Sequence, residues 1–75
     1  MDKFIELLKE ELDIDQEVTG DTLLTSIEDS DGDEVWNSLA HFVVVDIAGE
    51  HYDKEITPRQ VSVVETVKEL WGLII

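Results

Sequence analysis

The chain has 75 residues, enough for one small domain whose core is necessarily thin. Nineteen acidic residues against five basic ones give a net charge of −14, which repels nucleic acid and anionic membranes. The chain has no cysteine, which excludes a disulfide scaffold, and its longest apolar runs are too short to cross a bilayer.

The composition predicts a folded protein rather than a disordered one. Apolar residues make up 43% of the chain, which is ample for a core. The first ten residues mix charged and apolar side chains, a pattern that is not typical of a secretory leader. We therefore expect one cytoplasmic domain over residues 1–75, with no membrane association.

The acidic excess predicts protein partners with basic surfaces. A strongly negative field attracts basic patches and speeds their association at low salt. An alternative is that the acids serve only to keep the chain in solution. The net charge is well above the magnitude of about 2–8 that suffices for a small domain, which favours the first interpretation.

The first element in chain order is an amphipathic helix. Phe4, Leu8 and Leu12 recur at helical spacing, and Ile5 widens their stripe. We expect Asp2 to cap this helix and the helix to end near Leu12.

Residues 13–37 predict a long loop, because they are rich in Asp, Ser and Thr and contain two glycines. A loop of this length within a small domain usually has a role. Its apolar residues Leu23, Leu24 and Ile27 are expected to hold it against the core.

A second helix is predicted to begin at Ser38, with Asn37 as its N-cap. Its apolar residues cover most of its circumference, and the pattern continues to Ala48 before Gly49 weakens the last turn. The expected core-facing stripe consists of Leu39, Phe42, Val43 and Ile47.

Two further helices complete the prediction. Proline at the first position favours a short helix over residues 58–61. Thr66 and Glu69 form a capping-box pattern that opens a last helix. The expected stripe of that helix consists of Val67, Leu70, Trp71 and Ile74. The predicted fold is all-α: a small four-helix bundle, with three main helices, one short helix and a long loop between helices one and two.

Metal and catalytic chemistry find little support in the sequence. The run from Asp29 to Asp33 superficially resembles a calcium loop, which has glycine at its sixth position and glutamate at its twelfth. With Asp29 as the first ligand, Gly32 is fourth and Ala40 is twelfth, so neither position fits. We therefore expect no dedicated metal site. His41 is expected on a solvated helix flank, and no base accompanies Ser38, so we expect no enzyme.

The most informative group is Ser38, which follows Trp36 and Asn37 at the junction between the acidic loop and the apolar helix. A serine at the start of a helix presents its hydroxyl to other proteins. Trp36 is expected to fold back onto the helix as a hydrophobic staple or to anchor the loop, rather than to stack on a ligand.

The order of these features resembles the acyl carrier proteins and the related peptidyl and aminoacyl carrier domains. Their pattern is Asp-Ser-Leu at the head of helix two, an aromatic residue fourteen positions after the serine, and an acid followed by isoleucine shortly beyond. Here Asn37-Ser38-Leu39 opens the helix, Tyr52 lies fourteen residues after Ser38, and Glu55-Ile56 follows. The correspondence extends without gaps from Trp36 to Ile74.

This resemblance implies that Ser38 carries 4′-phosphopantetheine, transferred from coenzyme A, between Asn37 and Leu39. The arm would hold acyl or aminoacyl groups as thioesters for fatty acid, polyketide or nonribosomal peptide synthesis. The implied partners are a phosphopantetheinyl transferase and the acyl- or aminoacyl-transferring enzymes, and the implied carrier is a stand-alone monomer. A cargo chain would lie between helices two and three, near Val44, Ala48 and Val61.

Two departures from the family pattern bear on this implication. Asn37 replaces the usual aspartate, which preserves the cap but removes a charge that a transferase could pair with. Val43 stands where an acid is expected, so the partner surface is more apolar or shifted toward the acidic loop. The implied partner surface consists of Phe42, Val43, Asp46 and Glu50.

Two other interpretations stay open. The chain could be a carrier-like fold that is no longer modified and serves as an acidic interaction module. It could also be a divalent-ion-binding or other helical protein whose likeness to carriers is accidental.

The charge excess makes one prediction about stability. Like charges on a small folded surface repel one another, so added salt or magnesium should raise the melting temperature. A thermal unfolding series by circular dichroism over increasing sodium chloride and magnesium chloride measures this effect. A flat response would contradict the importance given to self-repulsion.

Overall fold

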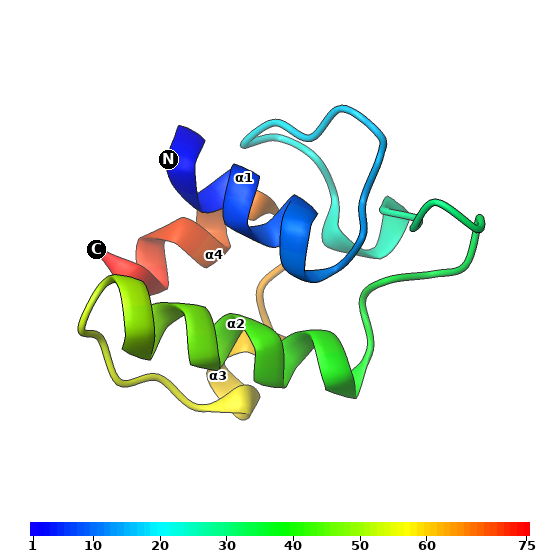
Figure 1. Cartoon of the computed structure of the whole chain (residues 1–75). Helices are drawn as coiled ribbons and strands as arrows, with labels where there is room; N and C mark the ends of the chain where they lie inside the picture. The colour runs from blue at the N-terminus through cyan, green and yellow to red at the C-terminus, as the bar shows by residue number, and fades with distance from the viewer.

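The computed structural model describes all 75 residues and is mostly helical with no strands, as predicted (Figure 1). None of its helices is both long and apolar enough to cross a membrane. The elements are α1 (Asp2–Glu11), the 3₁₀ turn η1 (Leu24–Ser26), α2 (Ser38–His51), α3 (Pro58–Ser62) and α4 (Val67–Ile74).

The longest helix, α2, organises the arrangement. It packs against α3 on one side and α1 on another, and α3 in turn contacts α4. Figure 1 shows α1 above α2, α3 behind and below α2, and the long loop from α1 to α2 curving over the top and right side of the molecule. The start of α2 therefore lies at the end of the bundle where the loop returns.

The core is formed only by apolar side chains, and no polar or charged residue is buried. Each fully buried aliphatic or aromatic side chain contributes about 1.5–3 kcal/mol relative to exposure. The largest completely buried side chains are Phe4, Leu24, Val44, Val61, Val67 and Leu70. They come from the loop and all four helices, so a single small core joins every element.

An aromatic cluster closes the core at the far end of α2. The ring of Phe4 lies 6.2 Å from Tyr52 and 5.4 Å from Trp71, and Tyr52 meets Trp71 edge-on at 5.3 Å. Such pairs contribute about 0.5–1.5 kcal/mol each beyond the area they bury. Burial raises the pKa of the Tyr52 phenol above its ordinary value. Tyr52, the aromatic residue of the carrier pattern, thus joins the end of α2 to α1 and α4.

The long loop is fastened to the core and to the start of α4. Leu24 and Ile27 are buried as predicted, but Leu23 is 51% exposed, so its expected anchoring role is wrong. The 3₁₀ turn η1 directs the Leu24 side chain into the core. The Leu24 N–H donates a hydrogen bond to the Glu65 carbonyl at 2.8 Å. Further along, the Val67 N–H donates to the Thr22 carbonyl at 3.2 Å. Backbone pairing of this kind is long-range and could not be predicted from local composition.

The start of α1 differs from the prediction. Asp2 lies inside the helix, and Met1 occupies the capping position without a side-chain hydrogen bond. Asp2 instead places its negative charge in the first turn, where it interacts favourably with the helix dipole. The helix ends at Glu11, close to the predicted Leu12.

The face that α2 turns to the core also differs from the prediction. Ile47 is buried and Val43 is half-buried, but Leu39 and Phe42 are 75% and 60% exposed. The helix is apolar nearly all round, so helical spacing alone does not select which face is covered. The helix continues past Gly49 to His51. Its buried face consists of Ala40, Val44, Ile47 and Ala48.

The caps of the last two helices show how their starts are fixed. Thr57 and Gln60 form a reciprocal capping box at α3, with the Thr57 N–H donating to Gln60 Oε1 at 2.9 Å. At α4 the predicted cap is half formed: the Glu69 N–H donates to Thr66 Oγ1 at 3.2 Å. The Glu69 carboxylate accepts from the Glu65 N–H instead of returning to Thr66.

The contrast between buried and exposed leucines gives a stability prediction. Leu70→Ala should destabilise the fold by about 2–5 kcal/mol, because it opens a cavity in a fully packed core. Leu39→Ala is the matched control and should change stability by at most about 0.5 kcal/mol. Urea unfolding measures both. Equal losses for the two variants would contradict the placement of Leu70 of α4 in the core and of Leu39 of α2 outside it.

Candidate functional site

Ser38 is the first residue of α2 and is exposed to solvent. The preceding residue, Asn37, has extended backbone geometry, and its side-chain oxygen accepts a hydrogen bond from the Ala40 N–H at 3.1 Å. The predicted N-cap is thereby confirmed. Because Asn37 fixes where the helix begins, it also fixes the serine hydroxyl at the open end of α2.

The electrostatic surroundings of Ser38 suit a negatively charged adduct. Free backbone N–H groups at a helix start carry partial positive charge and favour anions. The first turn of α2 contains no acidic side chain. A phosphate attached to Ser38 would therefore meet the positive end of the helix with no carboxylate in the same turn, although acids of α1 and the loop, among them Asp13 and Glu34, line the surface beside Asn37 and Leu39.

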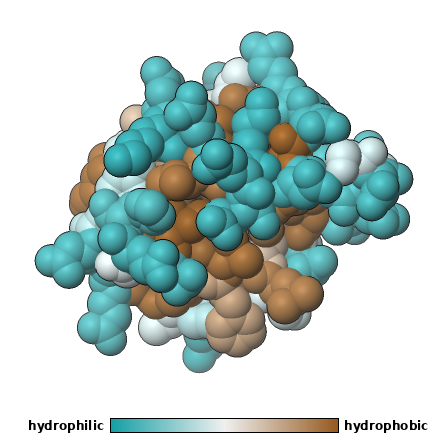
Figure 2. All heavy atoms as spheres, viewed as in Figure 1, coloured by the Kyte–Doolittle hydropathy of each residue, from teal (hydrophilic) through white to brown (hydrophobic).

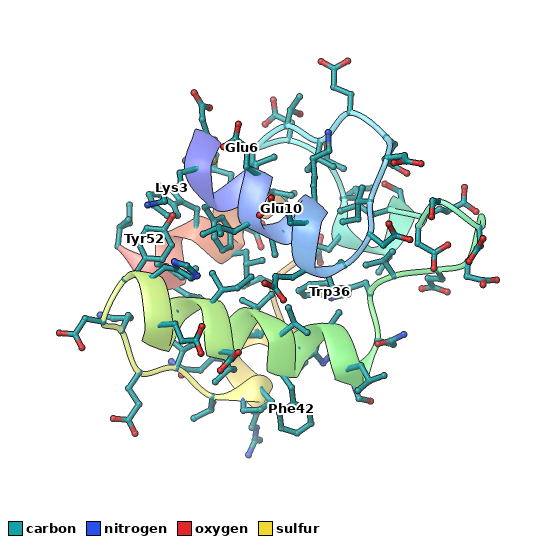
Figure 3. The ribbon with its side chains drawn as sticks, in the orientation of Figure 1. Lys3, Glu6, Glu10, Trp36, Phe42 and Tyr52 are labelled. Atoms are coloured by element: carbon teal, nitrogen blue, oxygen red, sulfur yellow. The ribbon has the colours of Figure 1, made fainter.

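The exposed side of α2 forms a shallow apolar groove beside Ser38. Figure 2 shows brown apolar surface over α2, while α1 and the loop are covered mainly by teal polar atoms. Figure 3 shows Phe42 pointing away from the other helices. The groove is lined by Leu39, Phe42, Val43, Val45, Asp46, Gly49 and Glu50. All four residues of the predicted partner surface therefore come together in one place.

A second concavity of about 540 Å³ opens on the other side of α2, between the loop and the link from α3 to α4. It contains His41, whose ring meets the half-buried Trp36 edge-on at 4.9 Å. The His41 Nε2 atom is buried and has no hydrogen-bond partner in the protein. The remaining lining residues are Leu23, Thr25, Ser62, Val63, Val64 and Glu65. We call this concavity the His41 cleft.

The cleft changes two expectations drawn from the sequence. His41 does not lie on a solvated flank, because Trp36 folds back from the loop and covers it. The expected cargo-lining residues Val44, Ala48 and Val61 are completely buried and line none of the cavities. The available opening lies nearer Ser38. The sequence signal for this cleft was the position of Trp36 and His41, which lie two residues before and three residues after Ser38.

The acidic loop contains a close group of three carboxylates. Oxygen atoms of Asp29, Asp31 and Asp33 lie within 4.8 Å of one another. Asp29 Oδ1 accepts hydrogen bonds from the N–H groups of Asp31 and Asp33, at 2.9 and 3.0 Å, and Gly32 supplies the left-handed residue of the turn. Turn formation accounts for this geometry. The absence of a dedicated metal site stays a prediction.

No family model, curated protein or solved structure matches this chain. The likeness to carrier proteins therefore rests on the residues quoted from the sequence. In the fold, Ser38 is exposed at the head of α2, Asn37 caps that helix and the half-buried Tyr52 packs against the core.

The cap gives a prediction for this site. Asn37→Ala should destabilise the domain by about 0.5–2 kcal/mol, because the Ala40 N–H loses its acceptor. Asn37→Asp is the control and should retain the stability of the original chain. The midpoint of urea unfolding measures both variants. An alanine variant as stable as the original would show that this cap does not fix the start of α2.

Proposed function

We propose that this chain is a carrier protein that bears 4′-phosphopantetheine on Ser38. The Ser38 oxygen would displace adenosine 3′,5′-bisphosphate from coenzyme A, losing its proton and forming a phosphodiester. The terminal thiol of the arm would then hold acyl or aminoacyl groups as thioesters. The observation that carries this proposal is the exposed serine hydroxyl at the first residue of a capped helix.

The surroundings of Ser38 support this assignment. The helix start offers N–H groups to a phosphodiester, and no acid lies in the first turn of α2 to oppose it. The residues present therefore suit the group chemically. When bound, the arm supplies the thiol, and this chain supplies the attachment oxygen and the surface by which enzymes find it.

The apolar groove on α2 is the proposed docking surface for the partner enzymes. Phe42 and Val43 provide an apolar centre, and Asp46 and Glu50 lie at its acidic margin. A matching partner would place an apolar patch between basic residues. Binding through such a surface should be fast and sensitive to salt. Once docked, the tether would keep the cargo at a high effective concentration in the partner's active site.

In this role the chain is a substrate and a carrier, and it catalyses nothing itself. One feature favours a second candidate function, an acidic interaction module that is not modified. Asn37 lacks the charge of the family's aspartate, so a transferase could lose part of its contact while the exposed apolar groove still binds proteins.

The test is modification of the purified chain by coenzyme A and a promiscuous phosphopantetheinyl transferase. Intact-protein mass spectrometry should show the gain of one phosphopantetheine. Ser38→Ala should abolish the gain, whereas Ser30→Ala, which removes an exposed serine in the acidic loop, should leave it unchanged. Asn37→Asp should speed the reaction if the missing charge limits recognition.

The same experiment separates the two candidate functions. Absence of a mass gain with several transferases, for both the original chain and Asn37→Asp, would contradict the carrier proposal and favour the unmodified module. Modification of Ser38→Ala would show that the attachment site is wrong.

A further inference from the structure

The His41 ring nitrogen is a polar atom that the protein itself leaves without a partner. Nε2 is buried, yet it forms no hydrogen bond with any group of the chain. Buried polar atoms in folded proteins are nearly always paired, since an unpaired one loses its hydration without compensation. A single orphaned nitrogen in a chain with no buried polar residue therefore points to a partner from outside the fold.

The position of this nitrogen relates it to Ser38. His41 follows Ser38 by three residues on α2, and side chains at this spacing are neighbours on a helix surface. Trp36 covers the imidazole from the loop side. A chain attached to the Ser38 oxygen could therefore lie along the first turn of α2 and enter the cleft beside His41.

The lining of the cleft indicates the chemistry of such a chain. Leu23 and Val63 give it exposed apolar walls, while Thr25 and Ser62 add hydroxyl groups. Glu65 lies on the same lining, and the chain carries a net charge of −14, so a carboxylate would be repelled. An alkyl chain would fill the cleft but leave Nε2 unpaired. A neutral amide or carbonyl oxygen on a slender chain satisfies both conditions.

We propose that His41 is a specificity-determining residue, which donates a hydrogen bond from Nε2 to a neutral amide or carbonyl oxygen on the chain tethered at Ser38. This inference rests on the proposed carrier function. The oxygen could belong to the arm close to the attachment point or to the cargo at its end. In both cases the cleft selects tethered chains that carry such an oxygen over plain hydrocarbon chains.

The absence of cysteine allows a test that needs no transferase. Ser38→Cys places a unique thiol at the attachment point of the full chain. Reaction with 2-acetamidoethyl methanethiosulfonate or with pentyl methanethiosulfonate attaches arms of equal length as mixed disulfides, with and without an amide. One hydrogen bond of ordinary strength should raise the melting temperature of the amide-armed protein by about 4–8 °C relative to the alkyl-armed protein.

Variants of the two histidines assign the effect. His41→Phe should remove the difference between the two arms. His51→Phe is the matched control, because His51 is exposed in the last turn of the same helix, and it should retain the difference. If His41→Phe does not fold, the imidazole nitrogen resonances of Ser38→Cys give the answer directly. The amide arm should shift the Nε2 signal of His41, and the alkyl arm should not.

Longer arms distinguish the two sources of the oxygen. A 6-acetamidohexyl arm, compared with a nonyl arm, places the amide where a cargo would be. A difference only for the short pair assigns the contact to the arm, and a difference only for the long pair assigns it to the cargo. Equal melting temperatures within both pairs, with unmoved His41 resonances, would overturn the inference.

These outcomes are independent of enzymatic modification. A failure of the transferase reaction with an intact arm effect would contradict the carrier function and leave the cleft as a binding site. Successful modification of Ser38 without an arm effect would contradict only the role of His41.

Discussion

The helix α2 is apolar on almost its whole circumference, and the three shorter α-helices and the loop cover only part of it. Ala40, Val44, Ile47 and Ala48 take the buried positions, and the core forms around them. The opposite side, including Leu39 and Phe42, is left in water. The composition of one helix thus provides both the packing that holds the domain together and the apolar surface proposed to bind partners. A substitution that made the outer face polar would leave the core intact.

The parts of the fold that depend on neighbours in the sequence could be predicted. Asn37 caps α2 because a cap requires only a side chain and an N–H three residues on, and Thr57-Pro58 opens α3 for the same reason. Which face of α2 is exposed could not be predicted, because in a helix that is apolar nearly all round the spacing of apolar residues does not indicate the buried face. The sequence predicted that Trp36 folds back onto α2, but His41 was expected in solvent, so its place beneath the indole was not predicted.

The distribution of charge links stability to the proposed function. All nineteen acidic side chains lie outside the core, because every buried residue is apolar. These carboxylates therefore repel one another at the surface, where dissolved ions and basic proteins can screen the repulsion. The first turn of α2 itself contains no acid, so the group proposed for Ser38 would join the molecule at the positive end of a helix whose surroundings are otherwise acidic.

The backbone pairing between the loop and α4 has a consequence for local unfolding. Thr22 and Gly20 accept hydrogen bonds from Val67 and Lys68, so the first turn of α4 cannot fray without releasing the loop. The two segments are distant in sequence but form one cooperative unit. Their amide protons should therefore exchange with solvent deuterium at a common rate, and this shared opening would loosen one wall of the cleft without melting α2.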